Sequence, residues 1–202
     1  GRVQQKWKRT SLSERIGIVE NAMDFFKENI ESIARDITLQ MGKPIKESRN
    51  EVIGMIKRSQ VLCELTEEAL KDISLPGLKG FNRFIRREPL GVILNISAWN
   101  YPLLIAVNVV VPAVLAGNAV SIKHSSLTPL CAIAFEEAFI NAGAPEGLVT
   151  YLTLDHKVTE SIIQSGLIHH VAFTGSVGGG QKIHQSASEK FIDIGLELGG
   201  KD

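Results

Sequence analysis

The chain has 202 residues, of which 44% are hydrophobic, and its 22 basic and 22 acidic side chains give a formal net charge of zero. This length suffices for one large domain or for one and a half small ones. The balanced charge argues against a nucleic-acid-binding surface and against attraction to an anionic membrane. Only two cysteines occur, Cys63 and Cys131, which excludes a disulfide framework and indicates a reducing, cytoplasmic compartment.

Apolar residues recur in steps of three and four near the start of the chain, which predicts a stripe on one helix or on two successive helices. The stripe consists of Leu12, Ile16, Val19, Met23, Phe26, Ile30, Ile33 and Ile37. Ser11 and Glu14 predict a capping box at its start. The Gly-Lys-Pro sequence at 42–44 ends it, and a second helix is expected from there to about Leu70. We therefore expect residues 1–71 to form a helical segment that packs on the domain that follows.

Residues 72–88 are expected to connect these helices to the next domain. Asp72–Gly80 contains a Pro-Gly pair and predicts a loop. Phe81–Arg87 is rich in aromatic and β-branched residues, which favours an exposed strand or the arm of a hairpin. A solvated basic linker is an equally good interpretation of this segment.

The chain carries no charge between Glu88 and Lys123, so this segment must be withdrawn from water. Leu103–Ile122 is long enough to cross a bilayer, but Pro112 and the Gly-Asn pair at 117–118 would interrupt a membrane helix. We therefore prefer a succession of strand, loop, helix and strand. The expected ranges are Val92–Ile96 for the first strand, Ser97–Tyr101 for the loop, Pro102–Ala116 for the helix and Ala119–Ile122 for the second strand.

Strands and helices continue to alternate after Lys123. Helices are expected over Pro129–Asn141, over Val158–Gln164 and from the glycine-rich loop Gly175–Gly180 to about Ala187, and strands over Leu148–Leu154, His170–Thr174 and Phe191–Leu196. Such regular alternation predicts an α/β fold, in which an open parallel sheet has helices on both faces. In this chain the sheet is preceded by the N-terminal helices.

Four strand ends carry a polar or glycine feature that a buried strand does not itself require. They are Asn100, Lys123, the pair Gly175-Ser176, and Glu197. Because the carboxyl ends of parallel strands face a common crevice, these residues should meet at one site. Taken singly, Asn100 is equally well a turn residue and Lys123 a solvated charge. Glu197 stands between two leucines, and apolar surroundings would suit a carboxylate that acts as a general base.

The loop Gly175–Gly180 resembles two phosphate-binding motifs and matches neither. Val177 stands where the dinucleotide fingerprint needs glycine, and Gln181 stands where the P-loop needs lysine. Backbone N–H groups at a helix N-terminus could still bind a diphosphate, and a tight turn is the other interpretation. The five histidines have no spacing typical of a metal site, so we expect no metal and assign them structural or surface positions.

Four segments together resemble the aldehyde dehydrogenase family: REPLGVILNISAWNYP, LLIAVNVVVPAVLAGNAVSIKHS, HHVAFTGSVGGG and LELGGK. LTLQMGKP in the N-terminal helices matches as well, so the resemblance covers essentially the whole chain. It implies a Rossmann-like dinucleotide-binding domain over 89–202, NAD or NADP as cofactor, and a small-molecule aldehyde as substrate. Residues 72–88 would correspond to the family's oligomerisation hairpin, which implies a homo-oligomer, either a dimer or a tetramer.

The resemblance also implies roles for individual residues. Asn100, in the W-N-Y-P motif, would stabilise the oxyanion of a thiohemiacetal, and Glu197, in the E-L-G-G-K motif, would activate water for thioester hydrolysis. The implied cofactor-binding residues are Ser97, Trp99, Lys123, Ser126, Gly175 and Ser176. Among these, Lys123 would contact the adenosine ribose, and Gly175 with Ser176 would contact the phosphates.

Three features depart from the family's pattern. The family's nucleophilic cysteine lies beyond E-L-G-G-K, and neither Cys63 nor Cys131 lies in a matching motif. Leu154–Lys157 replaces a glycine-rich segment that often follows the third strand. Ser126 replaces a common glutamate, which favours acceptance of NADP because Lys123 remains and the neighbouring His124 could add a donor.

The implied activity is NAD(P)-dependent oxidation of an aldehyde to a carboxylic acid. A reductive or CoA-acylating relative on the same fold, and a non-catalytic nucleotide-binding protein, are the alternatives. The chain starts without an initiator methionine and stops just after Gly-Gly-Lys, so both ends look like cuts. A targeting segment could therefore precede Gly1.

Overall fold

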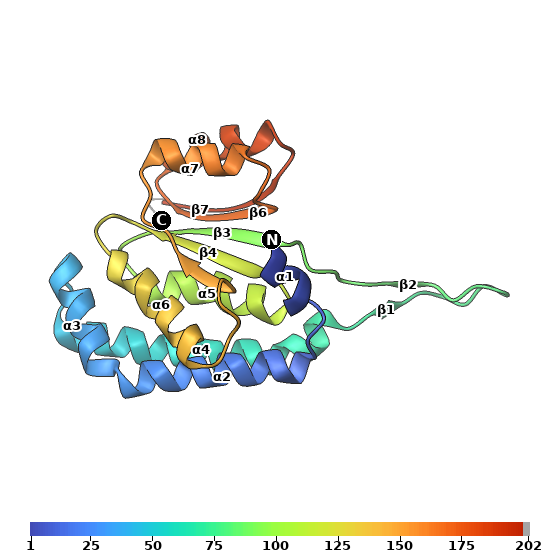
Figure 1. Cartoon of the computed structure of the whole chain (residues 1–202), viewed down its shortest axis with the longest axis horizontal. Helices are drawn as coiled ribbons and strands as arrows, with labels where there is room; N and C mark the ends of the chain where they lie inside the picture. The colour runs from blue at the N-terminus through green and yellow to red at the C-terminus, as the bar shows by residue number, and fades with distance from the viewer. Residues whose placement is uncertain (200–202) are drawn as a thin grey trace.

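A parallel sheet between two helical layers dominates the computed structural model, which describes residues 1–199 (Figure 1). Within these residues the main sheet has five strands in the order β5-β4-β3-β6-β7, and every neighbouring pair is parallel. The strands are β3 (Val92–Ser97), β4 (Ala119–His124), β5 (Val149–Tyr151), β6 (His170–Gly175) and β7 (Asp193–Leu198). The predicted open parallel sheet is thereby confirmed.

The direction in which the chain crosses this sheet reverses beside β3. From β3 the chain moves outward through β4 to β5, and it then returns to the other side of β3 and continues through β6 to β7. The carboxyl ends of β3 and β6 therefore flank a topological switch point, which is where open α/β sheets bind ligands.

One helical layer, below the sheet in Figure 1, combines helices that precede the sheet in the chain with helices that connect its strands. It contains α2 (Leu12–Glu28), α3 (Ile30–Met41), α4 (Ile45–Leu70), α5 (Pro102–Leu115) and α6 (Pro129–Asn141). The predicted apolar stripe is divided between α2 and α3 at Asn29. Ser11 caps α2 as predicted, because its Oγ accepts a hydrogen bond of 3.2 Å from the backbone N–H of Glu14.

Helix α5 is apolar except for the exposed Asn108, because it lies between β3 and β4 on one side and α2 and α4 on the other. It has 14 residues, and among residues 1–199 no helix is both long and apolar enough to cross a membrane. Leu103–Ile122 is divided between this helix and β4, as the preferred interpretation of the sequence expects. One hydrophobic core joins α2 to α6 with the sheet, and the division into 1–71, 72–88 and 89–202 stays a prediction.

The opposite face of the sheet is covered by α7 (His156–Gln164) and α8 (Val177–Ser188), so helices lie on both faces as predicted. This layer has its own smaller core. Its buried members are Leu94, Ile96, Ile163, Ile168, Val171, Ile183 and Ala187. The alternation along β3 explains the division, because Leu94 and Ile96 face this layer while Ile93 faces α5 and α6.

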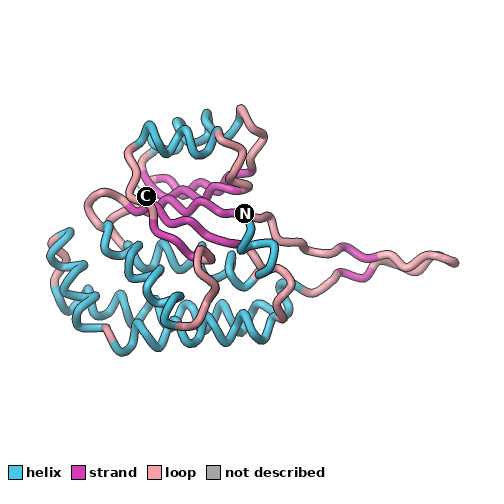
Figure 2. The backbone as a smooth tube through the Cα atoms, in the orientation of Figure 1, coloured by secondary structure: helices cyan, strands magenta, loops and turns pink. Residues whose placement is uncertain are grey.

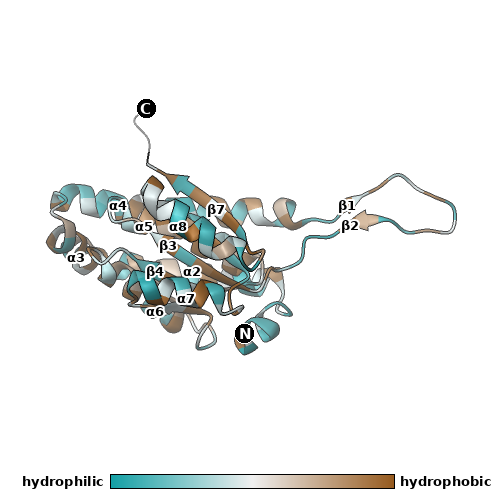
Figure 3. Cartoon of the chain, turned by 90° about the horizontal axis from the view of Figure 1, so that it is seen from above, coloured by the Kyte–Doolittle hydropathy of each residue, from teal (hydrophilic) through white to brown (hydrophobic). Residues whose placement is uncertain are grey.

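A two-stranded arm projects far from the body of the molecule (Figures 1 and 2), and it does so equally in the turned view of Figure 3. Its strands, β1 (Ile73–Ser74) and β2 (Phe84–Ile85), pair antiparallel. The predicted hairpin arm is correct, although β2 is shorter than expected and β1 comes from the segment predicted to be a loop. Phe81 near the tip is 68% exposed.

The other differences from the sequence prediction are mostly shifts of one or two residues at the ends of elements, and three are larger or bear on the site. Helix α1 (Arg2–Trp7) was not predicted. Strand β5 has three residues where Leu148–Leu154 was expected. Strand β7 extends to Leu198, so that Glu197 lies inside the strand instead of following it.

Candidate functional site

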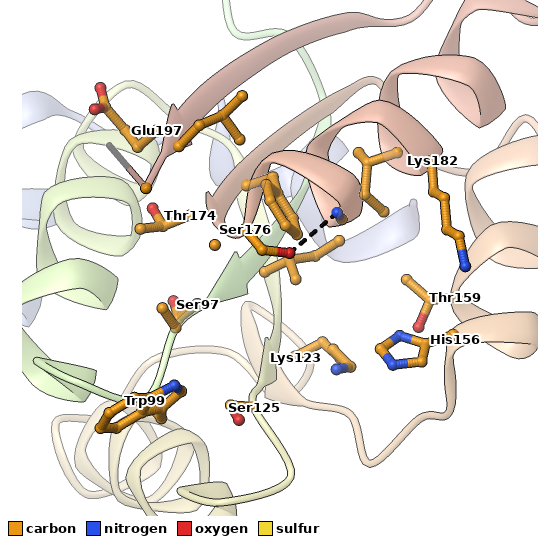
Figure 4. Close-up of a pocket in the computed structure, with 18 of the residues that line it drawn as sticks. Ser97, Trp99, Lys123, Ser125, His156, Thr159, Thr174, Ser176, Lys182 and Glu197 are labelled. Atoms are coloured by element: carbon orange, nitrogen blue, oxygen red, sulfur yellow. Dashed lines mark hydrogen bonds between the residues drawn. The ribbon is translucent and has the colours of Figure 1, made fainter. Parts of the chain in front are cut away.

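A cavity of about 990 Å³ lies at the carboxyl edge of the sheet, at the switch point (Figure 4). This volume is within the range of small-molecule binding sites. The structure places all eight predicted site residues in its wall: Ser97, Trp99, Asn100, Lys123, Ser126, Gly175, Ser176 and Glu197. They come from four strand ends and the loops that follow, while their chemical roles stay predictions.

The glycine-rich segment after β6 forms the first turn of α8. Ser176 is the N-cap of this helix, and its Oγ accepts a hydrogen bond of 3.1 Å from the backbone N–H of Gly179. A Cβ atom on Gly180 would lie 2.5 Å from Leu198 Cδ2, so α8 packs directly on β7. Gly178 and Gly179 line the cavity, which brings the positive end of the helix dipole to it. The segment therefore fits a diphosphate even though it matches neither standard motif.

Lys123 lies in the cavity wall and is only 8% exposed. Its register with Ile96 on β3 places it on the α7–α8 side of the sheet. Burial lowers the pKa of its ammonium group, and no carboxylate among residues 1–199 forms an ion pair with it. A partly desolvated donor of this kind is suited to an acceptor on a bound ligand.

Several cavity residues were not identified from the sequence. Those with polar side chains on the helices are His156, Thr159 and Glu160 on α7 and Lys182 on α8. Figure 4 shows His156, Thr159 and Lys182 on the same side of the cavity as Lys123. His156 is exposed, as its predicted surface position requires, but it also contributes to the site. These residues lie inside helices instead of at strand ends, and no motif marks them.

His124 does not reach the cavity, so the expectation that it adds a donor there is wrong. It follows Lys123 on β4 and therefore points to the other face of the sheet, in register with Ser97. Its side chain is buried, and neither ring nitrogen has a hydrogen-bond partner. Burial, assisted by the nearby Lys123 charge, lowers the pKa of His124 to about 4.

Glu197 faces away from α8. Leu196 and Leu198 alternate with it along β7, and the contact between Leu198 and Gly180 places these leucines on the α8 side. Glu197 therefore lies on the opposite side, in register with Thr174, and is exposed. The expectation of apolar surroundings for this carboxylate is wrong, because β7 is an edge strand and no helix of residues 1–199 covers this side of it.

The two cysteines lie away from the cavity, in the core of the α2–α6 layer. Burial raises the pKa of Cys63 to about 11 and that of Cys131 to about 12. Since the thiolate is the nucleophile, neither side chain is suited to attack a substrate. Among residues 1–199, no group of three or more His, Cys, Asp and Glu side chains could hold a metal ion.

The model of the aldehyde dehydrogenase family matches residues 1–202. This chain belongs to the aldehyde dehydrogenase family. It is 33% identical over 198 residues to the NADP(+) succinate-semialdehyde dehydrogenase of Deinococcus radiodurans, and the match covers 98% of this chain and 41% of that relative. It is 32% identical over 199 residues to the 3,6-anhydro-alpha-L-galactose dehydrogenase of Streptomyces coelicolor, where the match covers 98% and 40%.

The solved aldehyde dehydrogenase structures extend this agreement to three dimensions. The succinic semialdehyde dehydrogenase of Streptococcus pyogenes, solved in complex with NADP+, superposes with a TM-score of 0.93 at 28% identity. The superposition covers 100% of this chain and 44% of that one. The chain therefore spans less than half the length of the aldehyde dehydrogenases it matches.

Proposed function

We propose that this chain is the cofactor-binding part of an aldehyde dehydrogenase that oxidises an aldehyde to a carboxylic acid with NAD or NADP. The observation that carries the proposal is the meeting of Asn100, the N-terminus of α8 and Glu197 around one cavity. Membership of the family and the NADP named for two similar proteins support it.

The residues of the cavity would hold the cofactor along its length. Gly175 and Ser176, with the N–H groups that begin α8, would bind the diphosphate. Lys123 would donate to the adenosine ribose, with Ser97, Trp99 and Ser126 lining the rest of the site. Bound NAD or NADP supplies the hydride acceptor.

The chemistry would start from a cysteine thiolate outside residues 1–202, which adds to the aldehyde carbonyl. Asn100 would donate its side-chain N–H to the resulting oxyanion and stabilise it. Loss of a hydride from the same carbon leaves a thioester. Glu197 would then take a proton from water as this water attacks the thioester, which releases the carboxylic acid and the thiolate.

The substrate and the assembly are also proposals. The two similar relatives are named for chemically different aldehydes, succinate semialdehyde and an anhydro sugar, so we propose only a small-molecule aldehyde. The arm would bind a second copy of the chain in a homo-oligomer, because its apolar side chains, including Leu78 and Phe81, are exposed here. Two buried, unpaired cysteines support a cytoplasmic enzyme.

The test uses the intact enzyme with a panel of aldehydes, NAD and NADP. We expect steady formation of reduced cofactor together with one carboxylic acid per hydride transferred. Asn100→Ala should lower kcat by about 10²- to 10³-fold, as loss of an oxyanion donor does elsewhere. Asn141→Ala, on the exposed end of α6, is the control. Turnover that requires CoA would favour the acylating alternative, which needs no hydrolytic base, and an absence of any turnover would favour the non-catalytic one.

A further inference from the structure

The N-terminus of α5 is capped by a residue from another helix. Its own N-cap residue, Tyr101, makes no capping hydrogen bond with its side chain, and Pro102 has no N–H to donate. Glu51, on α4, instead accepts hydrogen bonds at Oε1 from the backbone N–H groups of Leu103 at 2.9 Å and Leu104 at 3.4 Å. A carboxylate at this end of a helix also complements the helix dipole.

Lys43 joins this cap to the loop that carries Asn100. It lies between α3 and α4, and its Nζ pairs with Glu51 Oε2. The same Nζ donates a hydrogen bond of 2.8 Å to the backbone carbonyl of Asn100. It also lies 4.0 Å from the centroid of the Tyr101 ring, within the range of a cation–π contact. One ammonium group therefore contacts the carboxylate that caps α5, the backbone of Asn100 and the ring of Tyr101.

This ion pair is buried, with 9% of the Lys43 side chain and 1% of the Glu51 side chain exposed. Burying two charges is expensive, and a buried pair is often no more stabilising than apolar residues of the same size. Stability is therefore a weak explanation for placing the pair here. The geometry of the pair offers a better explanation, because the pair connects the start of α5 to the backbone of Asn100, a residue of the cavity wall.

We propose that Lys43 and Glu51 are positioning residues, which fix the backbone of Asn100 so that its side-chain amide stays directed at the reacting carbonyl oxygen. The inference rests on the proposed function, since it acts through the oxyanion. A catalytic donor that shifts by about 1 Å can lose roughly a hundredfold in rate. Fixing the loop from outside the cavity should therefore affect the chemical step more than cofactor binding.

The experiment uses the intact enzyme and the double variant Lys43→Met/Glu51→Gln. Removing both charges together avoids the unpaired buried charge that either single change would leave, and the Glu51→Gln change retains a side-chain oxygen that can accept from Leu103. We expect kcat to fall by about 10- to 100-fold, while KM for the cofactor changes less than about twofold. Lys46→Met, at an exposed lysine three residues from Lys43, is the matched control and should leave kcat unchanged.

The decisive measurement repeats the double change in an Asn100→Ala background. If the pair acts through Asn100, it should lower kcat by less than about twofold there, because the group it positions is already gone. An undiminished loss in that background, or a loss of cofactor affinity as large as the loss of kcat, would overturn the inference. Lys43→Arg, which keeps a donor and a charge, should recover part of the rate. Full activity of Asn100→Ala by itself would instead overturn the proposed function.

Discussion

The ring of Phe173 lies so close to Gly175, two residues further along β6, that a Cβ atom on this glycine would be 2.7 Å from Phe173 Cζ. The same ring approaches Gly179 in the first turn of α8, where a Cβ atom would be 2.8 Å away. Neither glycine has a positive φ. Steric contact with one aromatic ring, and not an unusual backbone conformation, is therefore what requires glycine here.

This contact predicts different outcomes for two adjacent glycines. Gly179→Ala should push the Phe173 ring away, disturb the Ser176 cap and lower stability by about 1–3 kcal/mol. Gly178→Ala meets nothing within 4 Å and should raise stability by up to about 1 kcal/mol through helix propensity. Thermal unfolding with and without NADP measures both effects. Equal changes in the unfolding temperature of the two variants would contradict the steric explanation.

Glu197→Gln should separate the two chemical stages in the intact enzyme. In the proposed mechanism, hydride transfer does not need the carboxylate, whereas water activation does. We expect a rapid burst of reduced cofactor followed by slow turnover, because hydrolysis of the thioester becomes limiting. Stopped-flow absorbance of the reduced nicotinamide follows both phases. If burst and steady rate fall together, Glu197 serves another step.

Ser126 predicts that the intact enzyme uses NADP at least as well as NAD. A 2′-phosphate carries about −1.5 to −2 charges by analogy with phosphoserine. Ser126 adds no further negative charge to a wall that contains Lys123 and Lys182 as well as Glu160 and Glu197. Ser126→Glu should shift the ratio of kcat/KM values toward NAD, and Ser161→Glu, outside the cavity, should not. A hundredfold preference of the unmodified enzyme for NAD would contradict the prediction.

His124 predicts a loss of stability in mildly acidic solution. Its folded-state pKa of about 4 lies below the ordinary value of 6.5, so the unfolded chain binds the proton first as the pH falls. Stability should therefore decrease from pH 6.5 toward pH 4, by up to about 3 kcal/mol in total. Urea unfolding at pH 7.5 and 4.5 measures this change in stability. The variant His124→Leu should lose most of the pH dependence, and the variant at the exposed His184, His184→Leu, should keep it.

The features that follow from backbone topology could be predicted from the sequence. The order of apolar runs and turns located each strand of the main sheet, and the strand ends indicated Asn100, Lys123 and Ser176 because parallel strands all end at one edge. Side-chain alternation then decides which face a residue occupies. This is why Lys123 reaches the cavity and the adjacent His124 does not.

The features that could not be predicted from the sequence depend on contacts between segments that are distant in the chain. Helix α1 is short, and it is held by hydrogen bonds from Gln4 to Gly117 and from Trp7 to Val114, which no local pattern reveals. Lys182 reaches the cavity only because of how α8 is rotated on the sheet. The exposure of Glu197 follows from its position on an edge strand, and the leucines beside it in the sequence gave no sign of that.

The position of α5 has a consequence for how the molecule unfolds. This helix packs on β3 and β4 with one side and on α2 and α4 with the other, so its loss would expose apolar surface on the sheet and on the N-terminal helices together. We expect α2 to α6 with β3 and β4 to open as a single cooperative unit in hydrogen exchange. Helices α7 and α8, which pack on a separate and smaller core, should exchange earlier, and the proposed cofactor should slow their exchange most, because residues of both helices line the cavity.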